Sequence, residues 1–237
     1  MIDIVVCGAL GKMGRAVTGR ILDSSDLRLA GAVVEQKDAS VNCSVKLTPE
    51  EDIGDLLRKE KGSVVVEFTE PEATLRHARM SLSMGHNMVI GTTGLSDREI
   101  EYLKEETEKS QTSMVLSPNF SLGMNAVFGA VGMLSDVLRG YDTSIMEIHH
   151  KSKKDKPSGT ARALSERTGG KTEIHSIRAG EVLGEHIILF AGAGETIEIK
   201  HQALSRDCFA SGALQAARWV QGRRDGKVHS MSEVLGL

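Results

Sequence analysis

The densest group of residues capable of chemistry is the stretch EIHHKSKKDKPSGT at residues 147–160. Two adjacent histidines close an apolar run, and the lysines that follow outnumber the acidic residues on a chain whose net charge is −3. A positive focus on an acidic protein favours an anionic ligand. The SGT segment then precedes a helix-like run, and the amides of a helix N-terminus can bind a carboxylate.

Other interpretations of this stretch are weaker. A solvated lysine loop is the usual reason for such a run, but it does not explain the paired histidines or Pro157 before the helix-like segment. A metal centre built from His149, His150 and His186 is not favoured, because adjacent strand residues point to opposite faces and no HExxH or Cys/His spacing is present. If strand alternation persists, His149 and Lys153 share one face. We expect no metal and no cysteine or serine nucleophile here.

A second group, at the start of the chain, predicts a nucleotide site. The strand-like run 2–7 leads into GALGKMG at 8–14, where a helix-like segment begins. Glycines allow a tight turn and close approach of a pyrophosphate, whose charge the helix N-terminus meets. Glu35 ends the next strand-like run about 20 residues on, where a carboxylate can accept hydrogen bonds from ribose hydroxyls. This favours NADH, although Lys12 and Lys37 could tolerate a 2′-phosphate.

Two further polar loops follow strand-like runs. Residues 68–71 (FTEP) follow SVVVEF, and residues 91–94 (GTTG) follow NMVIG. Such segments are turns as often as they are sites. Because the carboxyl ends of parallel strands meet at one edge of a sheet, we expect both loops near the nicotinamide and its ribose.

The elements that must position these groups alternate along the first half of the chain. Apolar runs typical of buried strands occur at 2–7, 29–34, 63–68, 87–91 and 113–117. Helix-like segments lie between them at 13–22, 71–84 and 96–110, and the Thr48-Pro49-Glu50-Glu51 run has the form of a helix N-terminus. This pattern predicts an α/β, Rossmann-like doubly wound parallel sheet.

The regular alternation of strand-like and helix-like segments ends at about residue 121. A helix is expected over 122–138, and strands at 145–150, 173–177, 186–190 and 196–200 have few helices between them. This predicts a second α+β domain with a mixed or antiparallel sheet. We expect residues 1–121, completed by 208–237, to bind the dinucleotide, and residues 122–207 to bind substrate and drive oligomerisation.

Composition excludes several classes of protein. At 237 residues and 40% hydrophobic, the chain can build a core. Its acidic balance argues against nucleic acid as a partner, and no apolar run could span a bilayer. The start of the chain lacks the basic region of a signal peptide, and three scattered cysteines imply no disulfide framework. We therefore expect a cytoplasmic protein.

Segments along nearly the whole chain resemble the 4-hydroxy-tetrahydrodipicolinate (dihydrodipicolinate) reductase family of the diaminopimelate–lysine pathway. They are GALGKMGR at 8–15, EFTEP at 67–71, GTTG at 91–94, SPNFSLGMN at 117–125, EIHHKSKKDKPSGTA at 147–161, RAGEVLGEH at 178–186 and SRDCFASGALQAARW at 205–219. The HHxxKxDxPSGTA pattern is highly specific to that family.

The resemblance implies a homotetramer that reduces a cyclic dicarboxylate with NADH or NADPH. By matching position, His149 is the catalytic proton donor or acceptor and Lys153 the second catalytic residue. The substrate carboxylates would be held by His150, Ser158, Gly159 and Thr160. The cofactor would be lined by Gly8, Ala9, Leu10, Gly11, Lys12, Met13, Glu35, Phe68, Gly91, Thr92, Thr93, Ser117, Pro118, Asn119 and Phe120.

Three positions depart from the family pattern. Glu67 stands where Asp is common, Lys156 where Ala is usual, and Gln36 where many members have an Arg that can hold a 2′-phosphate. The last leaves the choice of cofactor open. The chain is also short for the family, which indicates trimmed loops in the second domain. Two rival functions are another two-domain nicotinamide dehydrogenase and a nucleotide-sensing module without catalysis.

Overall fold

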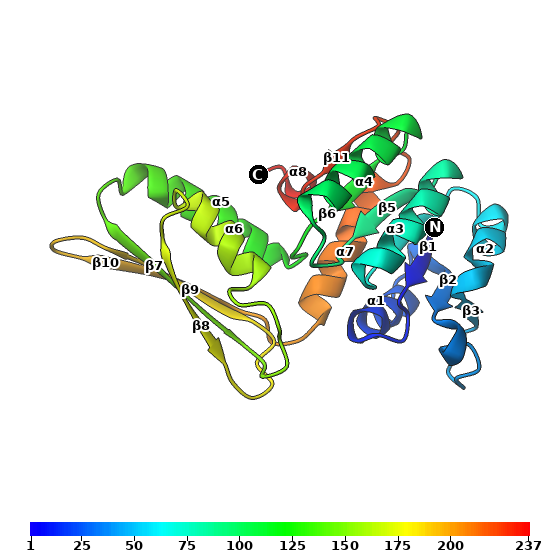
Figure 1. Cartoon of the computed structure of the whole chain (residues 1–237), viewed down its shortest axis with the longest axis horizontal. Coiled ribbons are helices and arrows are strands. Elements are labelled where there is room, and N and C mark those ends of the chain that lie inside the picture. The colour runs from blue at the N-terminus through cyan, green and yellow to red at the C-terminus, as the bar shows by residue number, and fades with distance from the viewer. The chain divides into compact units, whose positions relative to one another are not determined.

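The computed structural model describes residues 1–237, which fall into two compact units (Figure 1). The first contains Met1–Phe120 and Phe209–Gly236, and the second contains Ser121–Cys208 with the terminal Leu237. No helix in the chain has both the length and the apolar character needed to cross a membrane.

A seven-stranded sheet forms the centre of the first unit. Its strands are β1 (Ile2–Cys7), β2 (Leu27–Val34), β3 (Leu47–Pro49), β4 (Val64–Glu67), β5 (Asn87–Ile90), β6 (Met114–Leu116) and β11 (Val228–His229). They lie in the order β11-β6-β5-β4-β1-β2-β3, and every neighbouring pair is parallel. This confirms the predicted doubly wound sheet.

Helices cover both faces of this sheet, so most residues of its strands are apolar. They are α1 (Lys12–Leu22), α2 (Ile53–Lys59), α3 (Pro71–Ser83), α4 (Asp97–Lys109), α7 (Asp207–Val220) and α8 (Met231–Leu235), with short 3₁₀ turns η1 (Gln36–Asp38) and η2 (Glu50–Asp52). Strand alternation divides the core in two. Val6 packs in the cluster that includes α1, α7 and α8, whereas Val5 packs in the cluster that includes α2, α3 and α4.

The predicted helix start at Thr48 is wrong. Thr48 and Pro49 belong to β3, where Thr48 pairs with Val33 of β2, and η2 and α2 follow without a side-chain cap. The run has the residue types of a capping box, but its backbone forms strand β3 and pairs with β2 instead of starting a helix. By contrast, the helix expected from residue 96 is present, and Ser96 and Glu99 form a capping box at the start of α4.

The second unit contains a four-stranded mixed sheet, as predicted. Its strands are β7 (Asp142–His149), β8 (Glu173–Arg178), β9 (Glu185–Ala191) and β10 (Thr196–Gln202), in the order β10-β9-β7-β8. β7 and β8 are parallel because a helix, α6 (Gly159–Arg167), connects them; the other pairs are antiparallel.

One face of this second sheet is covered by α5 (Leu122–Val137) and α6, which run along the same side of the strands (Figure 1). Phe128 and Leu164 from these helices pack with Ile145, Ile188 and Phe190 from the strands. The opposite face carries the alternate residues, and within the second unit no helix packs on it.

Candidate active site

The glycine-rich turn lies where the sheet changes direction. β1 and β4 are neighbours, yet the chain runs from β1 to β2 on one side and from β4 to β5 on the other. The carboxyl ends of two such strands open a crevice for a ligand. Gly8 follows β1 with φ +76°, and a Cβ added there would lie 2.7 Å from the carbonyl oxygen of Phe68, the residue after β4. Only glycine combines this backbone with so close an approach.

The next glycines bring α1 against the same turn. A Cβ on Gly14 would lie 2.0 Å from the Gly8 carbonyl oxygen, so no side chain fits there. Gly11 is the N-cap of α1 and offers no side-chain hydrogen bond, so the first-turn amides of α1 are not capped by a side chain. This is the arrangement that binds a pyrophosphate.

A groove of about 620 Å³ opens beside this turn. It is lined by Gly8, Leu10, Gly11, Val33, Val34, Glu35, Asp38, Glu50, Phe68, Thr69, Glu70, Glu72, Ala73, Arg76 and His77. The close-packed glycines and the acid at the end of β2 fit the pyrophosphate and ribose of a nicotinamide dinucleotide. Five of the cofactor residues expected from the sequence, Gly8, Leu10, Gly11, Glu35 and Phe68, line this groove.

The remaining expected cofactor residues lie outside the lining of the groove. Ala9, Thr92, Ser117, Asn119 and Phe120 are buried. Thr92 Oγ1 is 2.7 Å from Thr74 Oγ1, the Ser117 hydroxyl donates to the Asn119 carbonyl, and the Phe120 ring meets Phe68 edge-on with centroids 6.0 Å apart. These residues shape the loops at the sheet edge.

Others in that set are accessible. Lys12, Thr93 and Pro118 are exposed, while Met13 and Gly91 are half-buried. A Cβ on Gly91 would lie 2.1 Å from the Phe68 ring, so this glycine fixes where the ring sits.

In the second unit, the end of β7 presents a buried acid–histidine pair. Glu147 and His149 lie two residues apart on one strand, so both side chains point to the same face. The Glu147 carboxylate is fully buried, and its Oε2 bonds Nδ1 of His149, which is 6% exposed. This contact leaves the other ring nitrogen, Nε2, for a ligand.

The Glu147 carboxylate is held by three further donors, one of which is the side chain of Ser176. Arg178, which lies opposite His149 in the β7–β8 register, donates through both terminal nitrogens at 2.9 Å, one to each carboxylate oxygen. The amide of Ser158, the N-cap of α6, donates to Oε1 at 3.3 Å. Sequence reasoning missed Glu147 and Arg178 as site residues, although both lie in the quoted family-like segments.

A second buried histidine packs against the first. The His149 and His186 rings meet edge-on with centroids 5.2 Å apart, and His186 Nε2 is 3.4 Å from the Ser158 hydroxyl. A Cβ on Gly184 would lie 3.1 Å from His149 Nε2, so glycine keeps space at that nitrogen. His186 was considered in the sequence only as a metal ligand, and here it is a packing partner.

Burial determines the charge state of this cluster. Burial lowers the pKa of His149 below its ordinary value, outweighing the opposing effect of Glu147, and Lys153 and Arg178 lower it further. Burial, together with repulsion from His149 when that ring is protonated, lowers the pKa of His186 to about 3. For Glu147, burial acts in the opposite direction, but hydrogen bonds led by Arg178 bring its pKa down to about 2. At neutral pH the cluster is therefore a carboxylate with two neutral imidazoles.

The predicted second catalytic residue lies in the turn after β7. The Lys153 ammonium pairs with Asp155 Oδ1 at 2.7 Å, and Asp155 also accepts the backbone N–H of Gly159, at the start of α6. Burial would raise the pKa of Asp155, but these contacts lower it. The Asp155 carboxylate is thus bound by Lys153 and by the N-terminus of α6, the two groups expected to hold the substrate.

The other expected substrate residues surround this turn. His150 is half-buried, and its Nδ1 is 2.8 Å from the Ser152 hydroxyl. Ser158 and Thr160 are buried at the start of α6. Lys156, which departs from the family pattern, is exposed.

A glycine turn at the switch point of a doubly wound sheet is how pyridine-nucleotide-dependent oxidoreductases hold their cofactor, and this chain is an enzyme of that class. It belongs to the dihydrodipicolinate reductase family. Residues 2–120 match the N-terminal model of that family and residues 123–235 match the C-terminal model.

Curated relatives match over essentially the whole chain. The 4-hydroxy-tetrahydrodipicolinate reductase of Methanosarcina barkeri is 38% identical over 100% of both chains. That of Rubrobacter xylanophilus is 40% identical over 99% of this chain and 98% of its own. Among solved structures, a dipicolinate-bound dihydrodipicolinate reductase from Paenisporosarcina sp. TG-14 has the same fold, with a TM-score of 0.82 at 21% identity and 98% coverage of each chain.

Proposed function

We propose that this protein reduces 4-hydroxy-tetrahydrodipicolinate to tetrahydrodipicolinate, with His149 and Lys153 acting on the substrate. The observation that carries the assignment of residues is the buried Glu147–His149 pair beside a lysine and the N-terminus of α6. The full-length curated relatives support the reaction.

The overall reaction adds a hydride and a proton to the substrate and releases its hydroxyl as water. The bound nicotinamide supplies the hydride. His149 moves the proton at Nε2, because its Nδ1 is engaged by Glu147. Lys153 stays cationic and stabilises negative charge that develops on the ring.

The substrate carboxylates bind where Asp155 now accepts from Lys153 and Gly159. His150, Ser158 and Thr160 lie beside this position and contribute to holding the two carboxylates. Burial of the Lys153–Asp155 pair is partial, so a dicarboxylate can compete with Asp155 for the lysine. The dipicolinate bound in the Paenisporosarcina structure agrees with a site for such an anion in this fold.

The cofactor preferred by this chain is NADH. Acidic residues dominate the groove, and its one arginine, Arg76, is already paired with Glu50 at 2.6 Å and Glu72 at 3.0 Å. Lys37 is paired with Glu35 at 2.6 Å. A 2′-phosphate would therefore meet a net negative charge, because the five acids of the groove outnumber these two cations, whereas ribose hydroxyls can donate to Glu35.

Steady-state oxidation of reduced cofactor, with substrate made fresh by the preceding condensing enzyme, tests the reaction. We expect kcat/KM for NADH to exceed that for NADPH by at least about tenfold. Glu35→Gln should narrow this ratio, and Glu51→Gln, outside the groove, should not. Tight NADH binding without turnover would instead indicate a nucleotide sensor.

The catalytic assignments need matched variants. His149→Asn and Lys153→Met should each lower kcat by about 10²–10⁴-fold. Lys154→Met, which removes an exposed lysine next to Lys153, should leave kcat near that of the unmodified enzyme. Equal losses in the two lysine variants would contradict the role given to Lys153.

We also propose that the protein works in the cytoplasm as a homotetramer joined through the uncovered face of the second sheet. That face carries Met146, Ile177 and Leu189, which are 37%, 41% and 36% exposed. Apolar side chains on an uncovered sheet face favour association with another copy.

A further inference from the structure

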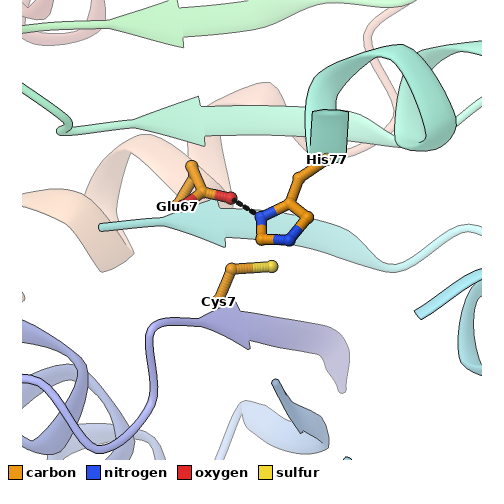
Figure 2. A group of neighbouring side chains, drawn as sticks. All are labelled: Cys7, Glu67 and His77. Carbon is orange, nitrogen blue, oxygen red and sulfur yellow. Dashed lines mark hydrogen bonds and ion pairs between the residues drawn. The ribbon is translucent and has the colours of Figure 1, made fainter. Parts of the chain in front are cut away.

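Three buried residues of different chemistry meet beneath the nucleotide groove of the first unit. Cys7 ends β1, Glu67 ends β4 directly opposite it, and His77 lies on α3, which packs on that side of the sheet (Figure 2). Each offers one ligand atom, and these atoms all lie within 4.8 Å of one another. None of the three is needed for the reaction proposed above.

The hydrogen bonds of this cluster leave one ring nitrogen unsatisfied. Glu67 Oε2 is 2.7 Å from His77 Nδ1, and Glu67 Oε1 accepts from the amide and hydroxyl of Thr69. His77 Nε2 makes no hydrogen bond, although the ring is only 3% exposed. Its nearest acidic atom is Glu50 Oε1, at 3.4 Å.

We propose that Cys7, Glu67 and His77 form a binding site for a zinc-like divalent cation. A thiolate, an imidazole and a carboxylate are all ligands of Zn²⁺ and Co²⁺, whereas Mg²⁺ and Ca²⁺ prefer oxygen alone. Ligand atoms around tetrahedral zinc are about 3.5 Å apart, so small side-chain shifts bring the three into range.

Charge and protons balance in both states of the site. We take the metal-free site to be a protonated His77 beside the Glu67 carboxylate, with the Cys7 thiol keeping its proton. The cation replaces two protons, one from the Cys7 thiol and one from His77 Nδ1, and the site stays neutral with a thiolate, a carboxylate and a neutral imidazole. The remaining ring proton is then on Nε2, facing Glu50, which is the second carboxylate that metal-bound histidines commonly use.

The direction of the pKa shifts agrees with this exchange. Burial, reinforced by Glu67, raises the pKa of the Cys7 thiol well above its ordinary value. Burial would lower the pKa of His77, but Glu67 and Glu50 raise it overall. Both shifts favour the protonated side chains, and a cation must displace those protons, so the affinity should rise with pH.

The three residues lie directly beneath the groove. His77 and Glu50 line it, although the His77 ring is only 3% exposed and Cys7 and Glu67 are fully buried, so a cation enters by displacing side chains at the floor of the groove. The site therefore lies under the proposed cofactor position and is chemically independent of the cluster around His149.

Cobalt titration of the full-length protein, first stripped of metal by a chelator, tests the proposal. One equivalent of Co²⁺ should produce a thiolate-to-cobalt charge-transfer band in the near ultraviolet, with tetrahedral visible bands. Cys7→Ala should abolish the charge-transfer band. Cys43→Ala and Cys208→Ala, which remove the other two thiols, should leave it unchanged. His77→Gln should weaken cobalt binding by at least about tenfold.

A second measurement guards against misfolded variants. Zn²⁺ should raise the Tm of the stripped unmodified protein by about 3 °C or more and leave the Tm of a folded Cys7→Ala protein unchanged. The proposal is overturned if no charge-transfer band forms, or if the band persists in Cys7→Ala and disappears with another cysteine. Reductase turnover of the metal-stripped enzyme is measured separately, so failure here leaves the proposed function intact.

Discussion

The surroundings of His149 favour its neutral form, whereas its proposed role as a proton donor requires the protonated form. Burial and the cations Lys153 and Arg178 keep the pKa of its imidazole below the ordinary value, despite the Glu147 carboxylate. A bound dicarboxylate adds negative charge beside this cluster and would raise that pKa. In the proposed reaction, the bound substrate therefore favours the protonated form of His149 that acts on it.

This reasoning predicts different pH profiles for the two kinetic constants. If protonated His149 is required, kcat/KM should fall as pH rises through the depressed pKa of the free enzyme, below about 6.5. The corresponding fall in kcat should lie at higher pH, because kcat reflects the pKa of His149 in the enzyme–substrate complex. Profiles measured between about pH 5 and 9 decide this. If the pH profiles of kcat/KM and kcat coincide, substrate charge does not raise the pKa of His149.

Glu147 is a positioning residue whose removal should be visible in the same profiles. Glu147→Gln keeps an acceptor for His149 Nδ1 but loses the charge that favours the imidazolium. We expect kcat to fall about 10–100-fold and the decline in kcat/KM to move to lower pH. Glu173→Gln, at the exposed start of β8, is the matched control.

A purely structural role for Glu147 would lower the free energy of unfolding without moving the profile. Some loss of stability is expected in any case, since the half-buried Arg178 loses its charged partner. Urea unfolding of the variant, measured beside its pH profile, separates the two effects.

Residue types alone located part of this site. The stretch at 147–160 has the composition of an acid–base site, and strand alternation would have paired Glu147 with His149. Arg178 and His186 were out of reach, because they join the site through the register of β7 with β8 and β9. That register depends on the packing of a whole sheet.

At the scale of helices and strands, apolar periodicity predicted the elements more reliably than helix-cap patterns did. The apolar runs placed the main strands correctly, because strands covered on both faces must be apolar. The Ser-x-x-Glu signature is correct at Ser96 and also marks Ser230, the start of the short α8 that sequence reasoning missed. The similar run at Thr48 fails, since its backbone pairs with β2. The two-residue β11 is too short to show any periodicity.

The contact between α1 and the glycine turn can be tested with two substitutions in one helix. Gly14→Ala places a methyl group 2.0 Å from the Gly8 carbonyl oxygen, so α1 must move away from the turn. We expect a lower Tm and NADH binding weakened by at least about tenfold, because the helix N-terminus no longer lies at the pyrophosphate position.

Gly19→Ala in the same helix is the control. No atom lies within 4 Å of a Cβ at Gly19, and alanine stabilises a helix interior by about 0.5–1 kcal/mol relative to glycine. Its Tm should rise slightly with unchanged NADH affinity. Equal behaviour of the two variants would show that helix propensity, and not the close approach, governs this position.

At the scale of the whole molecule, each unit has a distinct surface character. The first unit covers both faces of its sheet with its own helices, whereas the second covers only one. In the second unit, the residues opposite the helices alternate along each strand. Met146 pairs with Ile187, and Leu189 pairs with Ser144, so these side chains share the uncovered face.

A charge placed in the middle of that face should disrupt the proposed tetramer. Leu189→Glu puts a carboxylate on β9, where association would have to bury it without a partner. Light scattering after size exclusion should give the mass of four chains for the unmodified protein and a smaller mass for Leu189→Glu.

Val137→Glu, on the 74% exposed Val137 of α5, is the control and should retain the larger mass. Because residue 189 points away from the core of its own unit, the far-ultraviolet circular dichroism of the variant should be unchanged. A monomeric unmodified protein, or a tetrameric Leu189→Glu, would show that this face is not the interface.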